Sequence, residues 1–270
     1  IELEPSIYPV VFLSQKDAAI TSLITHIDDV SLPENKNERI AFISRSYAGL
    51  NSNKNTRTSD AVTIATVNEA TANRRIFSVY PDKIFMTFTL PWSVLNNMVT
   101  TQGLTALATG DLYSDAGLKI VTSYDTLTTA KLALLSPNIN PLGASNLFKL
   151  TVLLEVPAYY ACVSEAVECV LDSPSKPHTN TPVEGFTYLR KVSDWFTEKQ
   201  LDIIAGGGTF ILYQEASRSA VLVRHQLSTD VTSVESAELN VTKQVDYASK
   251  YYRSIIVPYI GKFVISNKLK

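Results

Sequence analysis

Short apolar runs of strand length alternate along this chain with stretches in which apolar residues recur at helical spacing. The run RIAFIS at 39–44 is typical of a buried strand, whereas residues 17–28 repeat apolar side chains every three or four positions. Near the C-terminus, 209–214 and 220–224 predict a β-hairpin, and 234–260 predict a long helix. Such alternation favours one sheet covered by helices. We therefore predict an α/β fold with a mixed β-sheet flanked by helices and a smaller inserted or N-terminal subdomain.

Proline and glycine punctuate the remaining predicted elements. Further strands are expected at 75–80, 83–90 and 147–156, with a weaker one at 120–124, and further helices at 159–171 and 198–205. Thr197 is the predicted N-cap of that last helix, which Gly206, Gly207 and Gly208 end. Polar loops are predicted at 51–60, 136–143 and 172–182, and residues 61–67 fit either a strand or a helix.

The long helix at 234–260 carries a regular apolar pattern. The spacing predicts one buried face, made of Val241, Val245, Ala248, Tyr252, Ile255 and Tyr259. Pro258 and Gly261 are expected to break the helix, and a strand is expected to start at Phe263.

The composition of the chain divides it into three parts. Residues 1–90 are expected to form the N-terminal part of a core and 147–270 the rest of it. Between them, 91–146 is rich in Thr, Ser, Leu and Asn, and we interpret it as an insertion or subdomain.

Charge and cysteine content exclude several classes of protein. The 270 residues hold 24 Lys and Arg against 26 Asp and Glu, so the basic excess typical of nucleic-acid binding is missing. No apolar run reaches the roughly 18–20 residues that span a bilayer. Two Cys rule out a disulfide-rich scaffold, and three His leave little room for a histidine-built metal site. Hydrophobic residues, at 45%, suffice for a sizeable core.

No motif in the sequence carries a reaction. The G-x-S-x-G pattern is absent, and the glycines at 206–208 follow a helix instead of opening one, unlike a phosphate-binding loop. Cys162 and Cys169 fall among aliphatic residues of a predicted helix, where thiols are usually buried and inert. We therefore predict no catalytic, cofactor-binding or metal-binding residue, and favour a structural or binding role.

Several short motifs follow one another in a recognisable order. They are RIAFI at 39–43, RIFSVYPD at 75–82, VPAYYA at 156–161, TNTPVEGF at 179–186, GGGTFIL at 206–212, VRHQLSTD at 223–230 and KQVDYASKYYRSIIVPYIGK at 243–262. In order and spacing, these motifs resemble the core of contractile tail sheath proteins of bacteriophages. The resemblance does not extend to residues 90–148.

The resemblance implies a structural protein without a cofactor. Sheath subunits form stacked hexameric rings around a tail tube, and the stack contracts to drive the tube through the host envelope during viral genome ejection. The implied partners are further copies of the chain, the tail tube protein and the baseplate, without nucleic acid or membrane. The implied location is the virion tail, with assembly in the host cytoplasm. Because sheath proteins continue beyond the I-G-K helix, we expect this chain, Ile1 to Lys270, to be a core fragment that is monomeric on its own.

Four residues of the resembling motifs are candidates for a structural or interface role. Arg224, His225 and Asp230 belong to VRHQLSTD, and Asp246 belongs to the D-Y-A motif of the last helix. Arg224 is expected to pair with a carboxylate, and Asp230, with Thr229, to cap the next stretch of the chain. A role in the fold and a role in a subunit contact both stay open for this motif.

Three alternatives remain beside the sheath interpretation. The first is another phage or secretion-system structural protein, such as a neck or tail-terminator protein that caps a ring instead of stacking. A hydrolase using Cys162 or an Asp/Glu pair is the enzymatic alternative. Recognition of a glycan or receptor by the Thr- and Ser-rich middle segment is the last.

Overall fold

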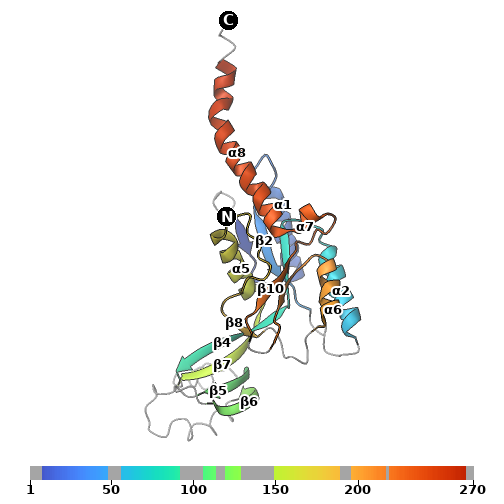
Figure 1. The fold of residues 1–270 in the computed structure, drawn as a ribbon, viewed down its shortest axis with the longest axis vertical. Helices are drawn as coiled ribbons and strands as arrows, with labels where there is room; N and C mark the ends of the chain where they lie inside the picture. Colours follow the sequence, from blue (N-terminus) through green and yellow to red (C-terminus); the bar gives the residue numbers. More distant parts are fainter. Residues whose placement is uncertain are drawn as a thin grey trace.

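A five-stranded mixed sheet forms the centre of the molecule in the computed structural model (Figure 1), which describes residues 8–47, 56–91, 106–113, 119–128, 149–188, 196–216 and 219–265. The order is β1–β2–β3–β9–β10, with the first four strands parallel and β10 antiparallel to β9. The strands are β1 (Pro9–Val11), β2 (Ile40–Ser44), β3 (Ile76–Tyr80), β9 (Thr209–Tyr213) and β10 (Leu222–Gln226). The predicted α/β class and the predicted hairpin are confirmed.

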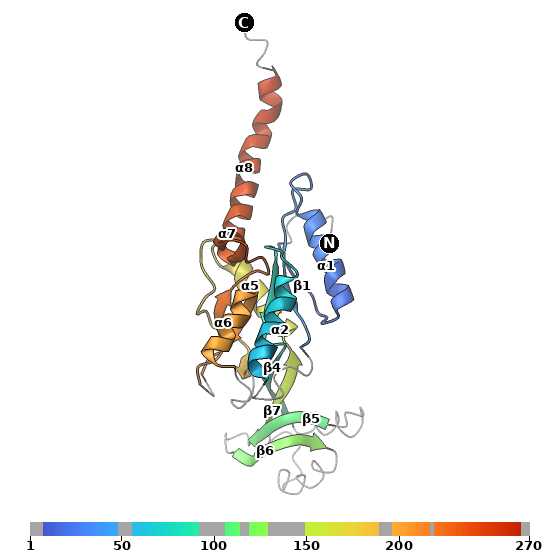
Figure 2. The same cartoon turned by 90° about the vertical axis from the view of Figure 1, so that its right-hand side faces the viewer.

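Helices cover both faces of this sheet. They are α1 (Asp17–Val30), α2 (Arg57–Glu69), α5 (Tyr159–Leu171) and α6 (Glu198–Gly206). Alternate residues of a strand face opposite sides, so Phe42 of β2 packs on the α5 side with Phe77 and Phe210, whereas Ile43 packs on the other side with Ile20 of α1. Helices α2 and α6 lie side by side on that second face (Figure 2).

The Gly206–Gly208 run allows α6 to approach its neighbours closely. A Cβ on Gly207 would lie 2.3 Å from the backbone oxygen of Ala65 in α2. Gly208 has φ +74°, a conformation that favours glycine, and turns the chain into β9. At the other end of α6, Thr197 is the N-cap residue as predicted, and its backbone N–H donates to Oε1 of Gln200 at 3.0 Å.

A second group of strands extends from one end of the central sheet. It comprises a three-stranded sheet in the order β7–β4–β8 and the pair β5–β6. The bounds are β4 (Lys83–Pro91), β5 (Ala106–Tyr113), β6 (Lys119–Thr128), β7 (Lys149–Pro157) and β8 (Phe186–Tyr188). The strands predicted at 83–90, 120–124 and 147–156 are confirmed. Strand β5 was not predicted, because ALATGDLY lacks both β-branched enrichment and clear alternation.

Other loop and helix predictions need correction near α2. Residues 57–60 of the polar loop predicted at 51–60 belong to α2, residues 51–55 lie outside the described residues, and residues 61–67 are helical. The Thr, Ser and Asn side chains of this region obscured the helical spacing, because these residues also favour turns. The loop predicted at 136–143 lies outside the described residues.

The C-terminal helix differs from the prediction in three respects. Helix α7 (Val234–Ala237) ends before α8 (Leu239–Ile265), and α8 continues through Pro258 and Gly261. The strand expected at Phe263 is therefore wrong. Pro258 removes one backbone donor, but the Ser254 residue whose carbonyl would accept it is exposed, so water can satisfy that carbonyl. In Figures 1 and 2, α8 projects beyond the central sheet at the end opposite to β5 and β6.

The predicted buried face of α8 is also wrong. Val245, Tyr252, Ile255 and Tyr259 are exposed, and the residues buried between Leu239 and Tyr259 are Leu239, Thr242, Lys243 and Asp246. The helix is thus attached mainly by polar side chains, which a search for apolar periodicity does not detect.

Candidate functional site

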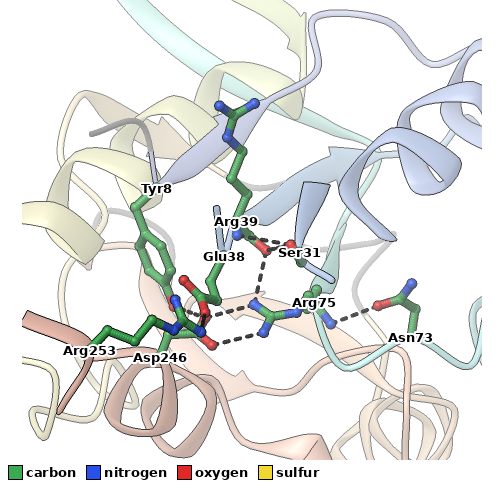
Figure 3. A network of polar contacts seen from close by, with 8 residues as sticks. All are labelled: Tyr8, Ser31, Glu38, Arg39, Asn73, Arg75, Asp246 and Arg253. Atoms are coloured by element: carbon green, nitrogen blue, oxygen red, sulfur yellow. Dashed lines mark hydrogen bonds and ion pairs between the residues drawn. The ribbon is translucent and has the colours of Figure 1, made fainter. Parts of the chain in front are cut away.

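Helix α8 is attached across the amino ends of β2 and β3 by a buried ion pair (Figure 3). Nη1 of Arg75 donates to Oδ2 of Asp246 at 2.7 Å, and Nη2 donates to Oδ1 at 2.8 Å. The hydroxyl of Tyr8 donates to Oδ2 of the same carboxylate at 3.0 Å. Both charged side chains are almost fully buried, so this bidentate contact fixes the position of the helix relative to the sheet.

The surroundings of Arg75 favour its charged form. Burial opposes the charge on Arg75, but the hydrogen bond to Asp246 and its negative charge outweigh burial and raise the pKa of Arg75. Burial, followed by the charge of Asp246, raises the pKa of Tyr8 well above its usual range. Tyr8 therefore stays protonated and serves as a hydrogen-bond donor.

A second polar contact lies further along α8. Arg253 donates to Oε1 of Glu38, the residue that precedes Arg39 at the start of β2. Burial alone would raise the pKa of Glu38, but the hydrogen bond from Arg253 and its charge lower it below the ordinary value. Two hydrogen bonds hold the backbone of Arg39, just before β2. The Arg39 N–H donates to Oγ of Ser31 at 3.0 Å, and Nη1 of Arg75 donates to the Arg39 carbonyl at 3.2 Å.

A second buried cluster joins α5 to the start of α8. Nδ1 of His178 lies 3.2 Å from Oε2 of Glu165, and Nζ of Lys243 lies 3.4 Å from Nε2 of His178. Because an ammonium only donates, Nε2 accepts from Lys243 and the Nδ1–H donates to Glu165. Burial raises the pKa of Glu165, against the effect of His178. The backbone N–H of His178 donates to Oε1 of Gln226 at 2.8 Å.

The four candidate residues from the sequence do not form one site. Arg224 donates to Glu198 at 2.7 Å and to Asp202 at 2.9 Å, which confirms the expected carboxylate partner. His225 is half-buried, and burial, then the charge of Arg224, lowers its pKa. Asp246 instead belongs to the buried pair with Arg75.

Asp230 shapes the turn that precedes α7. Its Oδ1 accepts from the backbone N–H of Thr232 at 3.0 Å and from the Thr232 hydroxyl at 2.6 Å. The hydrogen bond from that hydroxyl lowers the pKa of Asp230. Thr229 is buried, and its backbone N–H donates to the Ile76 carbonyl at 2.9 Å. Asp230 therefore organises the turn after it, as expected.

Sequence reasoning missed most members of the two buried clusters. The missed residues are Tyr8, Arg75, Glu165, His178 and Lys243. One signal was present, since Glu165 shares a helix face with Ala161, Cys162, Ala166 and Cys169. A carboxylate on an otherwise apolar face indicates a buried polar partner.

The cysteines have the character of core residues. Burial raises the pKa of Cys162 well above its usual range, which disfavours the thiol-based hydrolase alternative. Burial also raises the pKa of Cys169, to about 11. Cys169 lines a cavity of about 290 Å³ between α5 and α8, together with Tyr8, Val170, Lys243 and Tyr247 among others.

The described residues offer neither a metal site nor a membrane-spanning helix. Within these ranges, no group of three or more His, Cys, Asp or Glu side chains is placed to hold a metal ion. In the same part of the chain, no helix combines the length and the apolar character needed to cross a membrane.

Comparisons with known proteins find similarity in structure only. No protein-family model and no curated protein matches the chain. The fold is similar to a sheath tail protein from Desulfitobacterium hafniense, with 9% identity and a TM-score of 0.48, over 93% of this chain and 40% of that one. It is also similar to a sheath tail protein from Listeria innocua, with 11% identity and a TM-score of 0.46, over 96% of this chain and 39% of the other.

The chain thus spans about two fifths of the length of either sheath tail protein.

Proposed function

We propose that this chain is a structural subunit of a bacteriophage contractile tail sheath, acting through packing and interfaces instead of catalysis. The observation that carries the proposal is the convergence of the sheath-like motifs. These motifs are far apart in the sequence, yet in the fold they are bonded to one another in a single core.

The segment TNTPVEGF is bonded along the VRHQLSTD segment. The backbone N–H of Asn180 donates to the Val223 carbonyl at 2.7 Å, and that of Val223 donates to the Thr181 carbonyl at 3.0 Å. Val183 donates to the Val221 carbonyl at 2.8 Å. The backbone of TNTPVEGF therefore lies along β10, most of which belongs to VRHQLSTD.

The motif RIFSVYPD is bonded to two others. Its Arg75 holds Asp246 of the D-Y-A motif, and its Ile76 accepts from Thr229 of VRHQLSTD. The motif GGGTFIL supplies β9, which pairs with β3 of RIFSVYPD on one side and β10 on the other. The VPAYYA motif starts α5, whose Ala161 and Cys162 pack in the same apolar core.

In the proposed function, copies of the subunit form stacked hexameric rings around a tail tube. Contraction of the stack drives the tube through the host envelope, and the further partners are the tube protein and the baseplate. Residues 91–146 are an insertion into the core formed by 1–90 and 147–270. The virion tail is the location of the assembled protein, after assembly in the host cytoplasm.

Electron microscopy of the complete gene product that contains this sequence tests the proposal. Expressed alone and negatively stained, the product should form long tubes with a hexameric cross-section. Monodisperse monomers would overturn the proposal. Single closed rings that never stack would overturn it in favour of a neck or tail-terminator protein.

A further inference from the structure

Two lysines of α8 line the cavity of about 290 Å³ between α5 and α8. They are Lys243, which is 4% exposed, and Lys250, which is half-buried two helical turns further on. Among the described residues, neither ammonium group forms an ion pair with a carboxylate. A charge that leaves water without a counter-ion destabilises the protein. The described residues therefore supply two cations to this cavity and no counter-ion for either.

The groups that do contact the two ammonium groups are neutral. Nζ of Lys243 lies 3.4 Å from Nε2 of His178. Burial raises the pKa of the neighbouring thiol of Cys169 to about 11, and the charge of Lys243 opposes that rise. Nζ of Lys250 lies over the ring of Tyr8, 5.0 Å from its centroid. An ammonium has three N–H donors and binds charged oxygen acceptors most strongly, so both lysines retain donors for such an acceptor.

The acidic side chains of this region are engaged with other groups. Asp246 lines the cavity but belongs to the buried ion pair described above. Asp172 also lines it and accepts from Nζ of Lys176 at 2.8 Å. Glu165 lies against the other nitrogen of the His178 imidazole, so the ring separates its carboxylate from the ammonium of α8. The missing counter-ion is therefore an anion that enters the cavity from outside.

We propose that this cavity binds a single carboxylate group through Lys243 and Lys250. A carboxylate offers two oxygens, and each of them can accept a hydrogen bond from an ammonium. Asp172 and Asp246 line the same cavity, so a second negative charge on the ligand would be repelled. The charge of the lining thus favours a monoanion over a phosphate dianion.

The rest of the lining selects the body of the ligand. Val170, Pro174 and the aromatic side chain of Tyr247 provide apolar contacts, which suit a short aliphatic chain attached to the carboxylate. The volume of about 290 Å³ is at the small end of the range for ligand sites. Two sources share this chemistry: a free short-chain carboxylic acid, and the Asp or Glu side chain of another polypeptide segment. The experiments below distinguish them.

Butyrate is the probe for the free source, because it joins one carboxylate to a short aliphatic chain. The 270-residue chain is prepared with isotope-labelled lysine, and the ε-methylene NMR signals of Lys243 and Lys250 are identified by their loss in Lys243→Met and Lys250→Met. Titration with butyrate at constant ionic strength should shift both signals until they saturate. Butanamide, which has the same chain without the charge, should shift neither. The signal of Lys199, exposed on α6, should not move with either compound.

Lys250→Met gives the quantitative test for the free source, because Lys250 is only half-buried and its replacement should leave the fold intact. It removes one of the two cations, so the Kd for butyrate, measured on the Lys243 signal, should rise by about tenfold. Lys199→Met removes an exposed cation of α6 and should leave this Kd unchanged. Butyrate that binds with the same Kd to both variants would overturn the proposal.

Carbodiimide crosslinking of the complete gene product tests for a carboxylate that a polypeptide carries. The reagent joins a carboxylate to a lysine amine as an amide and takes up the water that is released, so only groups in contact react. For this source, mass spectrometry should find an amide between Lys250 and an Asp or Glu other than Glu38, Asp172 and Asp246, which already lie near it. Lys250→Arg keeps the charge but forms no such amide, and is the matched control.

The two experiments together decide the proposal. Saturable binding of butyrate that depends on Lys250 identifies a free carboxylic acid as a sufficient ligand, whereas the crosslink identifies a polypeptide as the source. Butyrate that shifts neither lysine signal, together with no crosslink from Lys250 to a further Asp or Glu, would overturn it. Neither readout depends on tube formation, so this proposal and the sheath function fail separately.

Discussion

The two sides of helix α8 reverse the usual distribution of residues in a globular protein. On the side that meets the sheet, most side chains are charged or polar, with Lys243 and Asp246 both buried. On the outward side, tyrosine and isoleucine side chains such as Tyr251 and Ile255 are exposed. Burial of apolar groups is non-directional, whereas hydrogen-bonded ion pairs require one geometry. The contrast indicates that the inner side specifies where the helix lies.

The contacts on the inner side of α8 fix the position of the helix more than they raise the free energy of unfolding. A buried ion pair often stabilises a fold no better than apolar residues of the same size, but removal of one partner leaves a buried charge without compensation. We therefore expect changes on the inner side to reduce the stability of the single chain, and changes on the outer side to leave it nearly unchanged.

The largest effect is expected for Asp246→Ala. This change leaves the guanidinium of Arg75 buried without its carboxylate, and should lower the free energy of unfolding by about 3–5 kcal/mol. Urea unfolding followed by far-UV circular dichroism measures it. The variant Arg75→Met with Asp246→Leu is the control, because it removes both charges together and should cost much less. A loss below about 1 kcal/mol for Asp246→Ala would contradict the conclusion that the inner side of α8 stabilises its position on the sheet.

A smaller effect is expected for Lys243→Met. It removes the ammonium that donates to His178 and keeps the length of the side chain. Because Glu165 also lacks a partner for Oε1 among the described residues, this cluster is less completely bonded than the Arg75–Asp246 pair. The expected loss is about 1–3 kcal/mol in the same unfolding experiment. A loss larger than that of Asp246→Ala would reverse the ranking of the two clusters.

The contact between Glu38 and Arg253 predicts a dependence on acid. The folded pKa of Glu38 lies below its ordinary value of 4.5, so the contact contributes stability above pH 4.5. That stability decreases as the pH falls from 4.5 through the lowered folded value. Glu38→Gln should lower the free energy of unfolding by roughly 1 kcal/mol at neutral pH, a small effect because Arg253 is partly exposed. In acid the substitution should have no effect, because Glu38 is then protonated and uncharged. Unfolding curves of both proteins at several pH values measure this difference, and a constant difference would contradict it.

The smallest effect on the single chain is expected for Tyr251→Ala on the outer side. The ring is exposed, so the free energy of unfolding should change by no more than about 0.5 kcal/mol. Light scattering should show both this variant and the unchanged 270-residue chain as monomers. A stable hexamer of the unchanged chain would contradict that expectation, and a large loss of stability in Tyr251→Ala would place the ring in the fold of the single chain.

Most of the central fold could be predicted because it is built from local patterns. Residues 40–44 are mainly apolar and form the fully buried β2, and the hairpin β9–β10 follows from two apolar runs joined by a polar loop. The capping pattern at Thr197 located the start of α6. In each case the information lies within a few neighbouring residues.

The attachment of α8 could not be predicted in the same way. Arg75 and Asp246 are 171 positions apart, and neither residue has neighbours in the sequence that indicate its partner. Apolar periodicity located the helix correctly but assigned its buried face to Val245, Tyr252, Ile255 and Tyr259, which are exposed. Periodicity shows that a face is to be covered, and does not show whether the same chain covers it.

The spacing of two contacts along α8 has a mechanical consequence. The Arg75–Asp246 pair and the Arg253–Glu38 pair are seven positions apart on the helix, which at 1.5 Å per residue is about 10 Å. A rod that is held at two separated points cannot tilt about either one while both contacts persist. The helix is therefore clamped, and a change in its direction requires one of the two ion pairs to open.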